Sequence, residues 1–568
     1  MRILLQVHGF NSLSQRLFVE LQSDGHEVSV EFDINDAVLT EAIDLFNPDV
    51  VLAPFLKRAI PARIWKDRLC LIVHPGIVGD RGPSALDWAI LRNEATWGVT
   101  VLQAEEEMDA GPIWAHAEFP MRAAGKSSLY RREVTNAALA AVREALDNLA
   151  TPGFEPRPLY YAQPEIRGRL QPAMRQPDRQ IDWEADGTEE VLRKIRSADG
   201  VPGVRDEIAG ADVFLHDARP APGLKGSAGA IIATSGPAIA RATRDGAVWI
   251  GHLRAPRSDT PFKLPATQVL QGRLPDVPKI DTDTVTGYRE ISYRDDGKVG
   301  YLGFDFYNGA MSVTQCERLL AAYRAALARP TKVIVLEGGE DFWSNGIHLN
   351  TIEAAESAAE ESWRNINAID DLAEAIIRTE SHLTVAAMRG NSGAGGVFLA
   401  RACDRVWLHD AVVLNPHYKD MGNLFGSEFW TYLLPRHCGS ENARRIAQQR
   451  LPMGAAEAVA LGLADSSLGA DKTAFEGRLA REAAKLALNF DESLAAKVAR
   501  RRAHEKEKPL SAYRDEELRK MRRNFFGFDT SYHVARYNFV HKICKSRTPV
   551  TLAMHRNKTC QPTMRNAS

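Results

Sequence analysis

Residues 385–404 read VAAMRGNSGAGGVFLARACD, an apolar run followed by a glycine-rich turn and a second apolar segment. The run at 384–388 is typical of a buried strand, and the glycines allow a ligand to approach the backbone closely. Further strands are expected at 299–304 and 331–338, and helices at 316–328 and 372–381. This alternation predicts an α/β domain around the turn.

The chain has 568 residues, too many for a single core, so two to four domains are expected. A formal net charge of -2 gives no basic excess that would favour nucleic acid or an anionic membrane. No apolar run approaches the roughly 20 residues of a membrane helix, and the first residues predict a buried strand instead of a signal peptide. The scattered cysteines contain no CxxC pair, which favours reduced thiols in a cytoplasmic protein without a metal site: Cys70, Cys316, Cys403, Cys438, Cys544 and Cys560.

Composition divides the chain into four parts. Residues 1–165 alternate strand-like and helix-like segments, which predicts a mostly parallel sheet covered by helices. A proline- and arginine-rich linker at 151–172 leads into residues 166–275, where a helix and short strands with Gly and Pro turns indicate a small β domain of barrel size. The third domain spans 285–545. Residues 546–568 form a tail that we expect to be loosely ordered.

The first domain carries a histidine at the end of a predicted strand, in the segment CLIVHPGIVGDRGPSALDWAI. His74 is therefore expected at the carboxyl edge of the sheet, where open α/β sheets hold their ligands. Thirty-five residues later, MDAGPI places Asp109 in a turn before another strand. The motifs RGPS, with Arg81 and Gly82, and WGVTV lie between them.

The four motifs, in their order along the chain, resemble those of the folate-dependent formyltransferases. Residues 180–203 resemble the segment that joins the two parts of methionyl-tRNA formyltransferase. The resemblance implies 10-formyltetrahydrofolate as the formyl donor, with Arg81 and Gly82 at the substrate. It also implies that His74 donates to the oxyanion and that Asp109 orients it or handles the acceptor proton.

Two positions depart from the formyltransferase pattern. Ala85 replaces a proline, and Ile72 replaces the asparagine that normally donates to the formyl oxygen at the substrate. Losing one such donor costs about 3 kcal/mol of transition-state stabilisation. A thiol acceptor would reduce the demand on the site, because a thiolate is a better nucleophile than a protonated amine.

Three segments resemble the crotonases (enoyl-CoA hydratases and isomerases), whose domain has a ββα-spiral fold. They are DFWSNGIHLN (341–350), NSGAGGVFLARACD (391–404) and LPMGAAEAVALGLAD (451–465). The resemblance implies an acyl-CoA pocket whose oxyanion donors are the N–H groups of Ile347 and Gly395. A helix opening at Gly396 would point the positive end of its dipole at the same oxygen.

The two positions at which hydratases carry carboxylates fall on Phe398 and, twenty residues later, on Tyr418. Addition of water to a double bond needs a carboxylate base, so hydration is not expected. Tyr418 is instead expected to donate or relay a proton, and Glu428 is a nearby carboxylate that could face the pocket. Phe398 and Trp343 are expected to form an apolar wall.

A formyltransferase module followed by a crotonase module resembles the HoxX-type hydrogenase maturation proteins, over nearly the whole chain. The resemblance implies a partner in the hydrogenase maturation machinery or the hydrogenase large subunit, and synthesis of the carbon monoxide ligand of the [NiFe] centre. The resulting hypothesis has two steps. The His74/Asp109 site transfers the formyl group to coenzyme A, and the crotonase pocket then decarbonylates formyl-CoA with Tyr418 and Glu428.

Two alternatives remain open on the sequence alone. The substitutions at Ile72 and Phe398 also fit a non-catalytic carrier that binds folate and coenzyme A, although the retained His74 and Asp109 argue against it. A formyltransferase that acts on an amine, with an attached acyl-CoA enzyme, is the second alternative.

Overall fold

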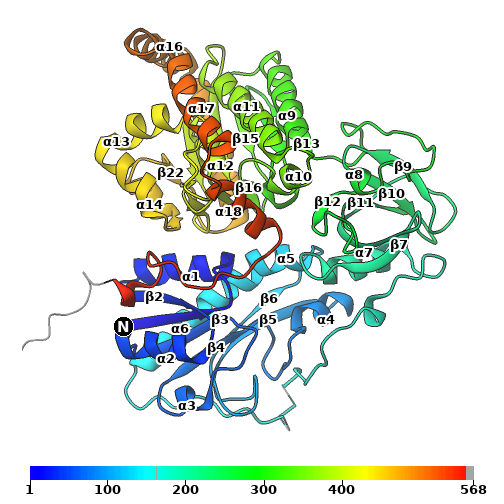
Figure 1. Cartoon of the computed structure of the whole chain (residues 1–568), viewed down its shortest axis with the longest axis vertical. Coiled ribbons are helices and arrows are strands. Elements are labelled where there is room, and N and C mark those ends of the chain that lie inside the picture. The colour runs from blue at the N-terminus through cyan, green and yellow to red at the C-terminus, as the bar shows by residue number, and fades with distance from the viewer. Residues whose placement is uncertain (162, 165, 558–568) are drawn as a thin grey trace, which may run out of the picture.

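The computed structural model describes residues 1–557 except 162 and 165. Figure 1 shows three modules in chain order: an N-terminal α/β module, a small β module beside it, and a large C-terminal α/β module above the first. The three fold classes expected from the sequence are confirmed.

The N-terminal module contains one six-stranded sheet in the order β2-β1-β3-β4-β5-β6. Its strands are β1 (Arg2–Val7), β2 (Glu27–Phe32), β3 (Val50–Phe55), β4 (Cys70–His74), β5 (Thr96–Gln103) and β6 (Ile113–Pro120). Its helices are α1 (Ser12–Ser23), α2 (Asp36–Phe46), α3 (Ala62–Trp65), α4 (Ala85–Leu91), α5 (Lys126–Leu129), the π-helix η1 (Tyr130–Val134) and α6 (Thr135–Ala150). The first four strands in space are parallel, whereas β5 and β6 are antiparallel. Because β4 ends at His74, this residue lies at the predicted carboxyl edge.

The linker expected at 151–172 follows the surface of the N-terminal module. Arg157 pairs with Ile113, and the N–H of Gly168 donates to the carbonyl of Val78 at 3.2 Å. A Cβ atom on Gly168 would lie 2.0 Å from the backbone nitrogen of Asp80. The linker therefore packs tightly against the loop that follows His74.

The second module is a mainly antiparallel sheet in the order β7-β8-β11-β10-β9, with β12 paired to β11. Its elements are η2 (Pro177–Arg179), α7 (Thr188–Ala198), β7 (Val204–Ile208), β8 (Ala211–Pro220), β9 (Ile231–Ser235), β10 (Ala238–Ala242), β11 (Ala247–Arg254), β12 (Lys263–Pro265) and α8 (Ala266–Val269). Apolar residues of α7 pack on the sheet and form the core of this module.

The C-terminal module has a six-stranded sheet, β13-β14-β15-β17-β19-β22, and a second sheet, β16-β18-β20-β21. The strands are β13 (Ile291–Asp296), β14 (Val299–Phe304), β15 (Val333–Glu337), β16 (Phe342–Ser344), β17 (Leu383–Met388), β18 (Asn391–Gly393), β19 (Arg405–Leu408), β20 (Val413–Asn415), β21 (Met453–Gly454) and β22 (Ser466–Ser467). The first helices are η3 (Tyr307–Gly309), α9 (Val313–Leu327), α10 (Leu349–Glu353), α11 (Ala358–Ile377) and α12 (Gly395–Arg401). The later ones are α13 (Trp430–Gln449), α14 (Ala455–Ala460), α15 (Lys472–Leu488), α16 (Phe490–Glu507), α17 (Leu510–Phe526), α18 (Ser531–Val540) and η4 (Met554–Arg556).

Helix boundaries in the C-terminal module differ from the sequence prediction, most of all at the start of α11. Helix α11 starts at Ala358, fourteen residues before the expected start at 372. Buried polar residues on α11, such as Asn365 and Asp370, interrupt the apolar pattern there, and both have hydrogen-bond partners. Helix α12 starts at Gly395 instead of Gly396.

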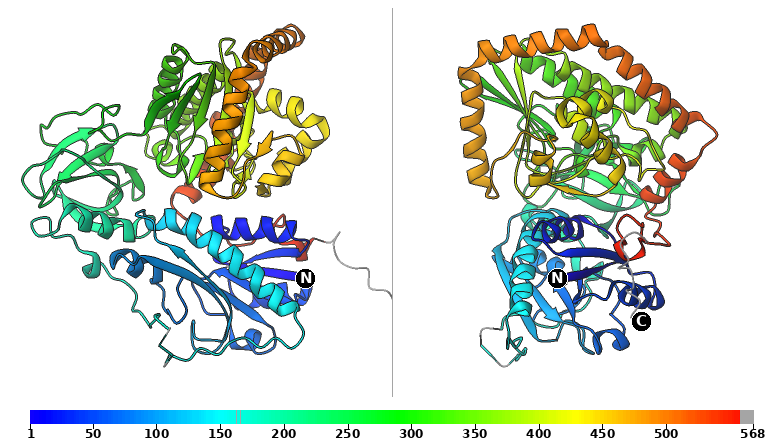
Figure 2. Two further views of the ribbon diagram at one scale, coloured as in Figure 1. Left: turned by 180° about the vertical axis from the view of Figure 1, so that it is seen from behind. Right: turned by 90° about the vertical axis from the view of Figure 1, so that its left-hand side faces the viewer.

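The tail was expected to be loosely ordered, and this expectation is wrong for residues up to Asn557. The segment returns to the N-terminal module beside β2, as Figure 2 shows. Buried Glu31 accepts hydrogen bonds from Thr548 and Arg556 and lies 3.0 Å from His555 Nε2. The ion pair between Arg556 and buried Glu31 is not visible in the composition of a short tail, because its partner lies 525 residues away. Residues 558–568, with Cys560, lie outside the described part of the chain.

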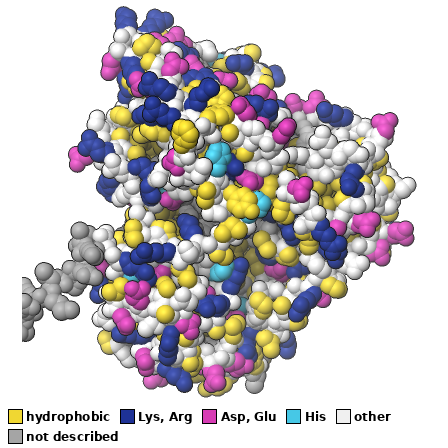
Figure 3. Space-filling view, viewed as in Figure 1, with side chains coloured by type: hydrophobic (Ala, Val, Ile, Leu, Met, Phe, Trp, Pro, Cys, Tyr) yellow, Lys and Arg dark blue, Asp and Glu magenta, His cyan; other side chains and the backbone are white. Residues whose placement is uncertain are grey.

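Within the described residues no helix is long and apolar enough to cross a membrane, and no cluster of His, Cys, Asp or Glu is suited to hold a metal ion. Five cysteines are free thiols in that same part: Cys70, Cys316, Cys403, Cys438 and Cys544. Figure 3 shows positive and negative side chains interspersed over one face of the molecule.

Replacing Glu31 by Gln should destabilise the N-terminal module, because it removes the buried carboxylate that pairs with Arg556 and contacts the buried His555, and leaves Arg556 with only the exposed Glu41 as an anionic partner. The expected loss is about 3 kcal/mol, visible as a lower Tm in scanning calorimetry. Glu41→Gln is a matched control, since the exposed Glu41 also pairs with Arg556. Its expected cost is below about 1 kcal/mol. Equal effects of the two substitutions would contradict the structural role of the buried pair.

Candidate active sites

The first candidate site is built around His74 at the end of β4. Its Nε2 atom lies 2.9 Å from Oδ2 of Asp80, and both side chains are almost completely buried. Burial raises the pKa of the Asp80 carboxyl, and the hydrogen bond from His74 opposes this rise. The pair therefore holds a proton between a ring nitrogen and a carboxylate oxygen in a poorly solvated place.

The turn after His74 makes this contact possible. A Cβ atom on Gly76 would lie 2.5 Å from both His74 Nε2 and Asp80 Oδ2, so only glycine leaves room for the hydrogen bond. The turn is fixed by Thr100, whose hydroxyl donates to the Gly76 carbonyl at 2.9 Å, and by Trp97, whose Nε1 donates to Pro75 at 3.0 Å.

Asp109 faces His74 from the other side. Its Oδ2 atom is 3.7 Å from His74 Nδ1, which is beyond hydrogen-bond length, and accepts the N–H of Gly82 at 3.3 Å. Arg81 donates to the carbonyl of Met108 at 3.1 Å and pairs with Glu107, which fastens the turn before Asp109. Asp80 makes the direct hydrogen bond to His74, and the expected role of Asp109, to orient or to handle the acceptor proton directly or through water, stays a prediction.

Ile72 shares a face of β4 with His74 and packs beside the apolar cluster of β1, β3, α2 and α3. It offers no polar side-chain atom in place of the asparagine of the pattern. The site therefore combines one histidine with two carboxylates, a set that can donate a proton to an oxyanion and accept one from a nucleophile.

The second candidate site lies where the turn before α12 meets the segment after β20. The carboxyl group of Glu428 lies over Gly395, because a Cβ atom there would be only 1.9 Å from Glu428 Oε1. The hydroxyl of Tyr418 donates to Glu428 Oε2 at 2.6 Å. Burial raises the pKa of the Tyr418 phenol well above its ordinary value, so Tyr418 remains a hydroxyl donor.

The two loops expected to carry the oxyanion donors are in contact. A Cβ atom on Gly346, directly before Ile347, would lie 3.5 Å from the nitrogen of Gly395. Gly396, expected at the substrate, packs instead on β16, where a Cβ atom would lie 2.1 Å from the Ser344 carbonyl oxygen. Gly396 thus allows the turn before α12 to pack closely on β16.

Phe398 is buried, and its ring stacks on Tyr418 with 5.5 Å between centroids and an interplanar angle of 19°. It therefore supports the tyrosine that is hydrogen-bonded to Glu428. The hydratase positions carry no carboxylate here, and the carboxyl that lies beside the turn before α12 is that of Glu428. Trp343 is also buried, in the same apolar core.

Two functional candidates were missed by the sequence reasoning at this second site. Asp370 on α11 and Glu517 on α17 are completely buried and lie around the backbone of residues 427–431. Burial raises the pKa of Asp370, Glu428 and Glu517, and the negative charges of neighbouring carboxylates add to the rise. No local motif marks these two residues. Asp80, by contrast, could have been noticed in the quoted string VGDRG.

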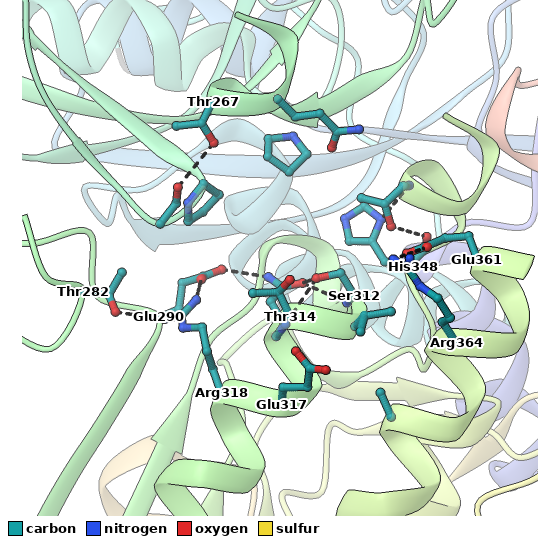
Figure 4. A pocket seen from close by; sticks show the side chains of 18 of the residues that line it. Thr267, Thr282, Glu290, Ser312, Thr314, Glu317, Arg318, His348, Glu361 and Arg364 are labelled. Carbon is teal, nitrogen blue, oxygen red and sulfur yellow. Dashed lines mark hydrogen bonds and ion pairs between the residues drawn. The ribbon is translucent and has the colours of Figure 1, made fainter. Parts of the chain in front are cut away.

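A cavity of about 1340 Å³ lies between the second and third modules and is lined by residues of both. Figure 4 shows Arg318 beside Glu290, which it contacts at 2.7 Å, and His348 on the opposite wall. His348 follows the expected oxyanion donor Ile347. Burial lowers the pKa of His348 to about 3, so its ring is neutral.

Comparison with known proteins agrees with this division into modules. The profile of the formyl transferase family matches residues 19–146, that of the formyl transferase C-terminal domain matches 173–273, and that of the enoyl-CoA hydratase/isomerase family matches 308–539. The chain is 57% identical to the hydrogenase maturation factor HoxX of Bradyrhizobium diazoefficiens, over 98% of this chain and 97% of that protein.

A crystal structure of HypX from Aquifex aeolicus in complex with tetrahydrofolic acid superposes with a TM-score of 0.94. It is 48% identical in sequence, and the match covers 98% of this chain and 99% of the other. The methionyl-tRNA formyltransferase of Dechloromonas aromatica is 28% identical over 36% of this chain and 62% of its own length.

The three raised carboxyl pKa values predict how stability depends on pH. A carboxyl whose pKa is raised on folding contributes stability that is fully present below its unfolded pKa and lost as pH rises through its folded pKa. The Tm of the C-terminal module should therefore fall from mildly acidic to mildly alkaline buffer. Glu428→Gln should flatten this dependence, whereas Asp371→Asn, at a half-exposed neighbour of Asp370, should not. A Tm that rises over this range would contradict the assignment.

Proposed function

Because the chain belongs to the HoxX family of hydrogenase maturation factors, we propose that it makes the carbon monoxide ligand of the [NiFe] centre from a formyl group. The family assignment rests on 57% identity over nearly the whole length. The observation that carries the proposed chemistry is the carboxyl of Glu428, which is hydrogen-bonded by Tyr418 and lies directly over Gly395 in the module that matches the enoyl-CoA hydratase/isomerase family.

The first step transfers formyl from 10-formyltetrahydrofolate to the thiol of coenzyme A. The thiolate adds to the formyl carbon, the carbon–nitrogen bond breaks, and the folate nitrogen takes a proton. His74, held by Asp80, donates to the oxyanion, and Asp109 handles the proton of the thiol. The solved relative with tetrahydrofolic acid supports folate as the donor.

The second step converts formyl-CoA to carbon monoxide and coenzyme A. The formyl carbon–hydrogen bond and the carbon–sulfur bond break, Glu428 takes the proton, and the sulfur receives a proton through Tyr418. No oxidant is needed, because the carbon keeps its oxidation state. The N–H groups of Ile347 and Gly395 would hold the carbonyl oxygen, and the apolar surroundings of Phe398 would keep out water that hydrolyses the thioester.

The hydrogenase large subunit, or another maturation protein, is the proposed recipient of the product. This proposal comes from the family alone. Formyl transfer to an amine and passive carriage of folate and coenzyme A remain as outcomes of the experiments below.

Purified protein supplied with 10-formyltetrahydrofolate and coenzyme A should release carbon monoxide, measured by haemoglobin absorbance. Tyr418→Phe and Glu428→Gln should abolish this release while tetrahydrofolate still forms, because the first site is intact. Tyr432→Phe is a matched control, since its hydroxyl contacts His504 instead of the pocket. Formate without carbon monoxide from the wild-type protein would contradict the second step. Unchanged function in Asp109→Ala would favour a carrier.

Gly76→Ala should slow tetrahydrofolate release roughly a hundredfold, because the added methyl group separates His74 from Asp80. Gly9→Ala is the control in the same module, since a Cβ atom there meets nothing within 4 Å. Release is followed by the absorbance change of the folate. Equal rates in the two variants would show that the His74–Asp80 contact is dispensable.

A further inference from the structure

The segment that carries Glu428 has an unusual backbone. Glu428 and the next residue, Phe429, both adopt left-handed conformations, with φ of 57° and 61°. Non-glycine residues rarely adopt this conformation, and two in succession persist only when surrounding contacts hold them. The contacts that hold this turn therefore also decide where the Glu428 carboxyl points.

Asp370, from the middle of α11, binds one side of the turn. Its Oδ1 atom accepts the backbone N–H of Glu428 at 2.8 Å, and its Oδ2 atom accepts the hydroxyl of Ser427 at 2.7 Å. Asp370 is completely buried, and so is Ser427. One carboxylate therefore fixes both the residue before Glu428 and the amide of Glu428 itself.

Glu517, from α17, binds the other side. Its Oε2 atom accepts the N–H of Phe429 at 2.9 Å, and its Oε1 atom accepts the N–H of Thr431 at 2.8 Å. Thr431 also donates its hydroxyl to Oε1. Each oxygen of this buried carboxylate serves a separate backbone donor, so a carboxamide cannot replace both.

We infer that Asp370 and Glu517 are positioning residues for Glu428: together they hold the two left-handed residues that direct its carboxyl onto Gly395. The catalytic importance of this role rests on the proposed function. The hydrogen bonds that define the role are present whatever reaction the site performs. The hydrogen bonds of both carboxylates go to residues 427–431 and not to Ile347 or Gly395, so neither is expected to bind substrate.

The same two side chains set the charge around Glu428. The titratable groups that face it are Tyr418 after β20, Cys316 on α9, Asp370 on α11 and Glu517 on α17. Arg514, also on α17, pairs with Asp371 and Glu374 at the edge of this group, and its charge reaches Asp370. Negative neighbours favour the protonated form of Glu428, so neutralising one of them should make Glu428 ionise at lower pH.

Asp370→Asn separates charge from geometry. The amide oxygen can still accept the N–H of Glu428, and the Ser427 hydroxyl can turn to accept from the amide nitrogen. The expected result is a shift of the Glu428 titration toward lower pH, by about one pH unit. Infrared spectroscopy follows it as the carbonyl band of a protonated carboxyl that Glu428→Gln removes. Asp371→Asn is the matched control and should leave the midpoint near its wild-type value.

Glu517→Gln tests the geometry, because its single amide oxygen leaves one backbone N–H of the turn without an acceptor. With formyl-CoA supplied directly, kcat for carbon monoxide release should fall at least about tenfold while KM stays within about twofold. Glu516→Gln, at the exposed neighbour that pairs with Lys508, is the control and should retain both parameters. Calorimetry identifies any variant that fails to fold.

The outcomes separate the inference from the function on which it rests. If the wild-type protein makes no carbon monoxide, the proposed function is contradicted. The infrared titration still tests whether Asp370 influences the ionisation of Glu428. A wild-type kcat in folded Glu517→Gln would overturn the positioning role. The same titration midpoint in Asp370→Asn and Asp371→Asn would overturn the effect of the Asp370 charge on Glu428.

Discussion

The ion pair between Arg131 and Asp341 joins the two large modules at the place where the second site begins. Arg131, on η1, lies 3.1 Å from Asp341, and its guanidinium stacks over the ring of Phe342 at 4.6 Å. Ser128 donates to the same carboxylate at 2.8 Å. Asp341 directly precedes β16, which leads to Ile347, so the loop proposed to carry an oxyanion donor in one module is fastened to a helix of the other. The geometry of the second site therefore depends on the docking of the first module.

Both sites place a carboxylate against a glycine that has no room for a side chain. Asp80 lies over Gly76 in the first site, and Glu428 lies over Gly395 in the second. In each case the carboxyl is buried and its pKa is raised by loss of solvation. Each is paired with a ring-bearing partner, His74 or Tyr418, that shares a proton with it. A hydrogen bond between a poorly solvated carboxyl and a ring-bearing side chain is thus common to both modules.

Much of the fold and part of each site could be predicted from local sequence. Strong short-range signals mark strand β4, the turn that contains Gly76 and the glycine-rich turn before α12. His74 was predicted from the first of these and Gly395 from the last, and Ile347 was predicted from the motif at 341–350. The pairing of His74 with Asp80 instead of Asp109 could not be predicted, because it depends on how a six-residue loop folds back under Gly168. The long first half of α11 was also missed, since its buried polar residues interrupt the apolar period used to recognise helices.

The sequence by itself determined the three modules, their order and the residue types available at each site, because these depend on hydrophobic pattern and on motifs of contiguous residues. Only the tertiary structure decided which carboxylates meet which partners. Glu31 finds His555 across almost the entire chain, and Asp370 and Glu517 converge on Glu428 from two separate helices. Buried polar groups need hydrogen-bond partners, and chain packing decides which residues lie close enough to serve. Because these partners are far apart in the sequence, no local motif predicts the pairing.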